Sequence, residues 1–267
     1  MFWVNGKPAK VVALSDRSFQ YGDGCFTTML TRRGEVQNWS LHVERMQDCL
    51  VLLGIRLPDW EQINTWLKQA ASDEELAGLK LHISRGAGGR GYNPVGAEEP
   101  LVTISHFPFP DQYHCWRNKG VELGVCQHKM GLTPLLAGHK HNNRLEQILC
   151  RAELESSGEQ DGIVCDIRGN VIETTMANLF WLKGQTLYTP DLKLCGVSGV
   201  IRRIVLQEAP KRGLTVMVGD FLPEHIHNAD EVFMTNSVLG VAPVVRIGLS
   251  AFSVGSVTRY FQENHNL

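Results

Sequence analysis

Lys140 is the first residue whose setting could support chemistry, because it lies where a loop with Pro134 and Gly138 leads into a helical pattern. A lysine that attacks an aldehyde must be partly removed from water, so that its amine is neutral often enough to react. These residues alone are also compatible with an ordinary surface lysine that is surrounded by water. The flanking His139 and His141 also suggest a metal site, but no third group of ligands accompanies them, so we expect no metal.

Glu173 is the second candidate, and it begins the stretch ETTMANLF after a predicted hairpin turn. A carboxylate held beside a pyridine nitrogen keeps that nitrogen protonated, and the charged ring then accepts electrons. The alternative is a surface glutamate beside a turn residue, Asn178. In either case we expect this stretch to span the end of a strand and a bend.

Two loops that contain glycine could bind anions. The loop GVSG (196–199) opens a predicted helix, and free backbone amides at a helix start suit a phosphate group. The stretch SRGAGGRGY (84–92) is not a dinucleotide fingerprint, since no βαβ unit with a later acidic residue surrounds it. We interpret it as a mobile loop whose Arg85 or Arg90 could bind a substrate carboxylate by bidentate pairing, or could simply be solvated.

The elements that must position these residues follow from the spacing of apolar side chains. The first hundred or so residues predict a hairpin around Arg33-Gly34 and a helix that starts near Leu41. The second half predicts a helix from Leu145 and two further hairpins, which turn at 168–170 and 183–185. The remaining predicted strands lie at 2–4, 11–14, 79–84, 101–106, 121–127, 214–218, 232–235 and 244–247, and the remaining helices at 59–72 and 200–209.

The prolines of FPFPD (107–111) indicate a boundary between two parts of the chain. We predict an α+β fold of two domains: a small N-terminal α/β domain over 1–108, a linker over 109–115, and a larger C-terminal α/β domain over 116–267. A cleft between two domains is a common place for a ligand. The late strands are expected to finish the chain.

The bulk composition excludes several classes of protein. The chain has 267 residues, of which 43% are hydrophobic, and its 26 basic and 28 acidic side chains argue against a general nucleic-acid binder. No apolar run approaches the length of a membrane span, and the start MFWVNGKPAK does not resemble a signal peptide. The seven cysteines form no CxxC pair, so we expect reduced, mostly buried thiols in a cytoplasmic protein.

Read in order, these motifs resemble the fold-type IV pyridoxal-phosphate enzymes over nearly the whole chain. This group comprises branched-chain aminotransferases, D-amino-acid aminotransferases and 4-amino-4-deoxychorismate lyases. The most specific part of the resemblance is the combination of Glu173, Asn178-Leu-Phe180, Tyr188-Thr189 and VSGVIR (197–202). The resemblance implies pyridoxal 5′-phosphate as cofactor, the two-domain α+β fold of the group, and a homodimer.

The resemblance also implies a role for each matching residue. Lys140 would carry the cofactor as a Schiff base, and Glu173 would pair with the pyridine nitrogen. Arg45 would bind the phosphate, and Arg144 falls where aminotransferases often place a tyrosine near the phenolic oxygen of the cofactor. Three further groups would assist at the phosphate: the backbone amides of Val200 and Ile201, and Ser237.

The segment SDRSFQYGDGCFTT (15–28) distinguishes the branches of the group. Aminotransferases usually continue after YGDG with phenylalanine, glutamate and glycine, whereas here Phe26 is followed by Thr27 and Thr28, as in the lyases. The hydroxyl of Thr28 would then carry a proton. The resemblance therefore predicts a lyase that takes 4-amino-4-deoxychorismate as its small-molecule substrate and releases 4-aminobenzoate and pyruvate, a step of folate biosynthesis.

Two rival functions remain open. One is a D- or branched-chain amino-acid aminotransferase, since one fold hosts several chemistries. The other is a catalytically silent binding or scaffold protein, although Lys140, Glu173 and Arg45 are all present together. His139 and Asn142 depart from the lyase pattern and leave the lysine intact.

Overall fold

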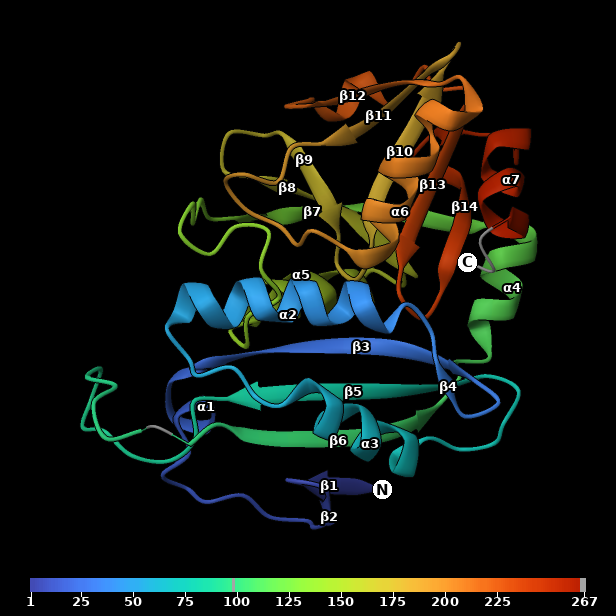
Figure 1. The fold of residues 1–267 in the computed structure, drawn as a ribbon. Coiled ribbons are helices and arrows are strands. Elements are labelled where there is room, and N and C mark those ends of the chain that lie inside the picture. The colour runs from blue at the N-terminus through green and yellow to red at the C-terminus, as the bar shows by residue number, and fades with distance from the viewer. Residues whose placement is uncertain (98, 265–267) are drawn as a thin grey trace. The chain divides into compact units, whose positions relative to one another are not determined.

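The computed structural model describes residues 1–97 and 99–264, and the chain folds into two compact units (Figure 1). The first unit comprises Met1–Phe109 and His139–Asn143, and the second comprises Pro110–Gly138 and Arg144–Leu267. The change of unit after Phe109 falls at the start of the predicted linker, but residues 112–115 begin a helix. The sequence also did not indicate that residues 139–143 belong with the first unit.

The first unit is built on a six-stranded sheet with the strand order β2-β1-β6-β5-β3-β4 (Figure 1). Every neighbouring pair in this sheet is antiparallel. Its elements are β1 (Phe2–Val4), β2 (Lys7–Pro8), α1 (Arg17–Tyr21), β3 (Gly24–Arg32), β4 (Glu35–Val36), α2 (Trp39–Leu53), α3 (Trp60–Ala70), β5 (Ala77–Ser84) and β6 (Leu101–Pro108).

The two sides of this sheet differ in chemistry, because side chains alternate along each strand. One side packs with α2 and α3 into an apolar core that includes Met29, Leu79, Leu81, Ile83, Met46, Leu50, Ile63 and Leu67. The alternate positions of β3 and β5 are paired in register as Phe26 with His82 and Thr28 with Lys80. These four side chains therefore share the side opposite the helices.

The second unit contains a nine-stranded mixed sheet in the order β12-β11-β10-β13-β14-β7-β8-β9, with β15 paired to β14. The pairs β11–β12, β14–β7 and β7–β8 are parallel. Its elements are α4 (Gln112–Lys119), β7 (Val121–Met130), α5 (Leu145–Ser156), β8 (Asp161–Asp166), β9 (Val171–Thr174), β10 (Asn178–Lys183), β11 (Thr186–Pro190), α6 (Val200–Glu208), β12 (Thr215–Gly219), β13 (Glu231–Asn236), β14 (Gly240–Ile247), β15 (Ser250–Ala251) and α7 (Ser256–Asn264), with 3-10 turns at Pro210–Arg212 and Pro223–His225.

Most predicted elements are confirmed, including the hairpins that turn at 33–34, 168–170 and 183–185. The strand expected at 11–14 is wrong, because these residues form no strand and Val11 is 80% exposed. The late strands do not finish the chain, since α7 follows them. The apolar pattern that would predict α7 from the sequence is short, because only Val257 and Phe261 bury apolar side chains in this helix. These two residues are four apart and lie on one face.

Six of the seven cysteines are buried as predicted, and Cys115 is exposed. All seven are free thiols. Among residues 1–97 and 99–264, no helix combines the length and the apolar character needed to cross a bilayer.

Candidate functional site

The structure divides the predicted site residues between the two units. The first unit contains Thr28, Arg45, Arg85, Arg90 and Lys140, and the second contains Arg144, Glu173, Val200, Ile201 and Ser237.

Lys140 lies on a short extended segment that adds to the edge of β3. The amide of Phe26 donates to the Lys140 carbonyl at 3.0 Å, and the amide of Asn142 donates to the Gly24 carbonyl at 3.0 Å. The Lys140 ammonium Nζ lies 4.7 Å from the centroid of the Phe26 ring. Thr28 follows Phe26 by two residues and faces the same side of the strand. The structure thus brings the predicted nucleophile and the predicted proton carrier to one face of the first unit.

Two residues of this face were missed by the sequence analysis. Lys80 pairs with Thr28 in register, and its Nζ lies 4.5 Å from the Phe26 ring centroid. Burial lowers the pKa of Lys80, and burial together with the Lys80 charge lowers the pKa of His82 to about 4. His82 is therefore neutral near pH 7, whereas Lys80 adds a second amine to the face that carries Lys140. In the sequence LKLHIS (79–84), Lys80 and His82 alternate with apolar residues, and this alternation could have indicated that both face the same side of a strand.

Arg45 is half-buried on α2 and contacts β3. Its Nη2 donates to the hydroxyl Oγ1 of Thr27 at 2.5 Å, and the same hydroxyl lies 2.6 Å from Nδ1 of His42. Thr27 was identified only as a marker of the lyase branch, and His42 was not singled out. Their spacing on the helix, three residues from His42 to Arg45, is the signal that places both over the same strand.

Arg85 is only 9% exposed, and its guanidinium is directed into the first unit. It donates to both carboxylate oxygens of Asp23 and to the carbonyls of Leu53 and Gly54. Burial raises the pKa of Asp23, but hydrogen bonds from Arg85 and Arg17 hold it below its ordinary value. A substrate role for Arg85 stays a prediction, and Arg90 is the exposed member of the pair.

The glycine-rich loop is folded around Arg17, which is 3% exposed. The Arg17 guanidinium donates to the carbonyls of Gly88, Gly91, Tyr92 and Asn93 at 3.0–3.5 Å. A Cβ atom at Gly88 would lie 2.4 Å from the Gly96 carbonyl oxygen, so only glycine fits there. The loop that carries Arg90 therefore has a defined backbone path.

In the second unit, Glu173 is a buried carboxylate at the end of β9, with 6% of its surface exposed. Its Oε2 accepts from the Val197 amide at 3.0 Å and from the side-chain amide of Asn178 at 3.4 Å. The Asn178 amide nitrogen also donates to the Val197 carbonyl at 2.8 Å, and its oxygen accepts from the Gly199 amide at 3.1 Å. Asn178 thus fixes the GVSG loop and Glu173 to one another.

This arrangement requires a glycine at 199, because a Cβ atom there would lie 2.1 Å from Oδ1 of Asn178. Gly199 is the N-cap of α6, and the helix begins at Val200 as predicted. The first amides of a helix, here those of Val200 and Ile201, have no intrahelical acceptor and lie at the positive end of the helix dipole. This end of α6 can therefore hold an anion.

Ser237 lies in the turn between β13 and β14, and Asn178 pairs with Thr235 of β13 in register. This turn therefore adjoins the strand end that carries Asn178. Arg144 is the half-buried residue immediately before α5. Its predicted role near a phenolic oxygen stays a prediction.

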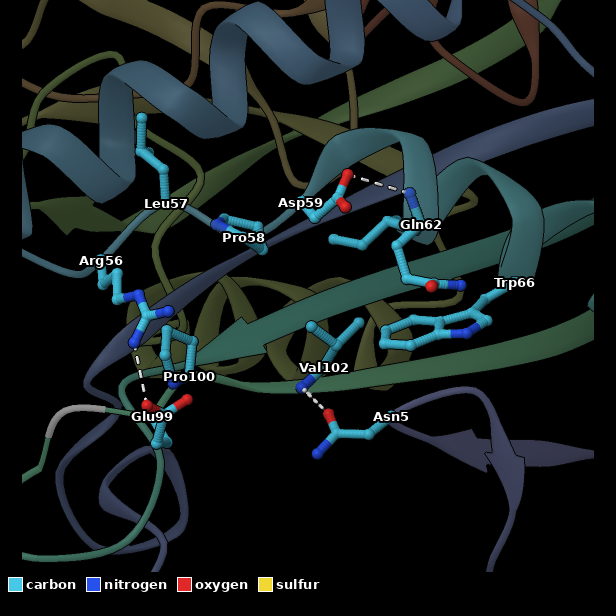
Figure 2. A pocket seen from close by; sticks show the side chains of 11 residues that line it. Asn5, Arg56, Leu57, Pro58, Asp59, Gln62, Trp66, Glu99, Pro100 and Val102 are labelled. Atoms are coloured by element: carbon cyan, nitrogen blue, oxygen red, sulfur yellow. Dashed lines mark hydrogen bonds and ion pairs between the residues drawn. The ribbon is translucent and has the colours of Figure 1, made fainter.

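A pocket of about 310 Å³ in the first unit contains none of the predicted site residues (Figure 2). Trp66 of α3 forms one wall, and an Arg56–Glu99 ion pair crosses the rim at 2.9 Å. Both of these charged side chains are more than two-thirds exposed, so the ion pair contributes little to the stability of the fold. Among the described residues, no group of three or more His, Cys, Asp or Glu side chains could hold a metal ion.

Comparison with known proteins supplies the context for these residues. The family model of amino-transferase class IV matches residues 24–247. A protein named aminodeoxychorismate lyase from Vibrio harveyi is 52% identical over 272 residues, which cover 100% of both chains. A D-alanine aminotransferase from Bacillus licheniformis is 26% identical, over 88% of this chain and 83% of that protein.

A crystal structure of 4-amino-4-deoxychorismate lyase from Pseudomonas aeruginosa matches with a TM-score of 0.92 and 35% identity, over 99% of this chain and 97% of that chain. This match confirms the predicted α+β architecture of fold type IV. With residues 24–247 matched by the family model, the chain belongs to the class IV aminotransferase family.

Proposed function

We propose that the chain is a pyridoxal 5′-phosphate-dependent lyase that converts 4-amino-4-deoxychorismate into 4-aminobenzoate and pyruvate. The observation that carries the proposal is the full-length 52% identity to a protein named aminodeoxychorismate lyase. The shared face of Lys140 and Thr28 supplies the amine and the hydroxyl that this reaction needs.

The residues present fit the cofactor. Lys140 offers an amine beside an aromatic ring, and Glu173 is a buried carboxylate whose Oε2 is held by neutral donors, as a partner of a protonated ring nitrogen must be. Arg45 in the first unit and the start of α6 in the second are groups that bind phosphate. When bound, pyridoxal 5′-phosphate supplies a ring that accepts the electrons released at the substrate carbon.

The chain's own residues supply the proton transfers. The Lys140 amine, in its neutral form, removes the hydrogen from the substrate ring carbon that bears nitrogen, which is the work of a positioned general base. The Thr28 hydroxyl relays a proton, which the Lys140 ammonium formed in the first step can replace, to the ether oxygen of the departing group; the bond between the ring carbon and this oxygen breaks, and the enolpyruvate released tautomerises to pyruvate. The Lys80 ammonium faces Thr28 across the β3–β5 pair and adds positive charge on the face where the anionic substrate would lie.

The assay of this function uses purified protein incubated with 4-amino-4-deoxychorismate. We expect 4-aminobenzoate and pyruvate to appear in equal amounts. The absence of both products, together with rapid amino-group exchange between amino and keto acids, would favour an aminotransferase. Protein that remains colourless with added cofactor would favour a catalytically silent relative.

Replacing Thr28 by alanine should slow elimination by roughly 10²-fold, the usual contribution of one positioned proton donor. Cofactor affinity should stay close to that of the unmodified protein, because Thr28 acts on the substrate. Single-turnover release of pyruvate measures the first effect, and an absorbance titration with pyridoxal 5′-phosphate measures the second. Thr28→Ser, which keeps the hydroxyl, is the matched control. Loss of cofactor binding in Thr28→Ala would contradict the assigned role.

We also propose a homodimer in the cytoplasm. The free thiols suit a reducing compartment. Helix α5 has an apolar stripe at spacings of three and four residues: Leu145 is 74% exposed, Ile148 59% and Leu149 56%, and Ala152 is also exposed. Cys150 and Leu154 lie on the buried side of the same helix. Such a stripe suits contact with a second copy of the chain.

Leu149→Glu should convert a dimer into a monomer, because it places a charge in the α5 stripe. Light scattering coupled to size-exclusion chromatography gives the mass directly. Leu249→Glu is the control, since Leu249 is fully exposed in the β14–β15 turn and is not part of the α5 stripe. A dimer that persists in Leu149→Glu would show that the stripe is not the interface.

A further inference from the structure

Two buried polar groups of the first unit, Thr27 and His42, form a chain that leads to Arg45. Thr27 is 0% and His42 1% exposed, and the Thr27 hydroxyl contacts both His42 Nδ1 and Arg45 Nη2. Such groups are costly to bury unless each hydrogen bond is made, so their arrangement is strongly constrained. The reaction outlined above uses neither Thr27 nor His42.

The direction of one of these hydrogen bonds follows from the chemistry of the donor. A guanidinium has only donors, so Arg45 must donate to Oγ1 of Thr27. The second hydrogen bond joins Oγ1 of Thr27 to Nδ1 of His42, and either atom can donate it, because the hydroxyl can accept two hydrogen bonds and a neutral imidazole has two tautomers. Burial, and next the charge of Arg45, lower the pKa of His42 well below its ordinary value, which agrees with a neutral ring.

We propose that Thr27 and His42 are positioning residues, a neutral relay that fixes the Arg45 guanidinium in the orientation that binds the cofactor phosphate. The relay adds no negative charge next to Arg45, because a hydroxyl and a neutral imidazole are its two members. A carboxylate at position 27 would instead compete with the phosphate for the same guanidinium. The inference rests on the proposed function, in which Arg45 binds that phosphate.

The geometry of the two elements explains why both residues are needed. Thr27 is on the α2 side of β3, opposite in direction to its neighbours Phe26 and Thr28. His42 and Arg45 lie three residues apart on α2, so both reach the same hydroxyl. The relay thus connects the helix that carries Arg45 to the strand that carries Thr28.

The test compares pyridoxal 5′-phosphate with pyridoxal, which has the same ring and no phosphate. The full-length protein is stripped of cofactor, and the dissociation constant of each compound is measured by absorbance titration. Thr27→Val keeps the shape of the side chain and removes the hydroxyl. We expect it to weaken pyridoxal 5′-phosphate binding roughly tenfold or more, the usual effect of a hydrogen bond to a charged group, and to leave pyridoxal binding unchanged.

Thr27→Ser is the matched control and should bind both compounds as the unmodified protein does. His42→Phe removes the ring nitrogen that bonds to Thr27 and should act in the same direction as Thr27→Val. Thermal melting follows the folding of every variant. The proposal is overturned if Thr27→Val binds pyridoxal 5′-phosphate normally, or if it loses both compounds equally. Unmodified protein that binds neither compound would contradict the proposed function itself.

Discussion

Lys140→Ala is expected to abolish turnover, with a loss of roughly 10³-fold or more, because no other group replaces both the covalent link and the base. The purified variant should also lose the yellow colour that a Schiff base with the cofactor gives. Treatment with borohydride fixes such a link permanently to the lysine. Mass spectrometry of the treated protein should therefore find the cofactor on residue 140 in the unmodified chain and on no residue in the variant.

Lys80→Ala is the control for this experiment. The two ammonium groups lie at nearly the same distance from the Phe26 ring, 4.5 Å for Lys80 and 4.7 Å for Lys140. Loss of a positive charge from this face is therefore common to both variants, whereas only Lys140 is assigned the covalent link. If Lys80→Ala also lost the borohydride-fixed cofactor, or if Lys140→Ala kept it, the assignment would be wrong.

Glu173→Gln is expected to lower kcat by roughly 10²–10³-fold, the range found when one fixed electrostatic group is removed from a site. The glutamine keeps the size of the side chain and an oxygen that can accept from the Val197 amide. It lacks the negative charge that would keep the ring nitrogen of the cofactor protonated. The measurement is single-turnover kinetics at saturating cofactor.

Glu231→Gln is the matched control, because Glu231 is also 6% exposed in the second unit. Its carboxylate accepts from the amides of Val257 and Thr258 and from the Thr258 hydroxyl, so it anchors α7 to β13. This variant should lower the melting temperature and leave the kcat of the folded protein close to normal. An equal loss of kcat in both variants would indicate that Glu173 acts through stability alone.

For the candidate site, the sequence predicted best the arrangement of residues that are close together in the chain. Glu173, Asn178 and the GVSG loop lie within 27 residues (173–199), and hairpin turns and a helix start determine their arrangement. Helix α6 begins at the predicted residue because Gly199 ends the extended backbone before it. Local signals of this kind are visible without knowledge of the fold.

The sequence did not predict contacts that depend on strand register or on distant partners. Lys80 joins the face of Lys140 and Thr28 only because β3 and β5 pair in one register. Arg85 was assigned to an exposed loop, but the Asp23 carboxylate, 62 positions earlier, binds it in the interior. A short apolar run at 11–14 resembled a strand, yet no partner strand pairs with it in the described part of the chain.

Because residues 139–143 belong to the first unit, splitting the chain after Phe109 would not give two intact units. A break after Phe109 would give an N-terminal fragment whose β3 lacks the extended segment that bonds to Phe26 and Gly24. The C-terminal fragment would carry Lys140 on a stretch whose bonding partners on β3 had been removed. Truncation or domain exchange at this apparent boundary would therefore separate Lys140 from the strand to which its backbone bonds.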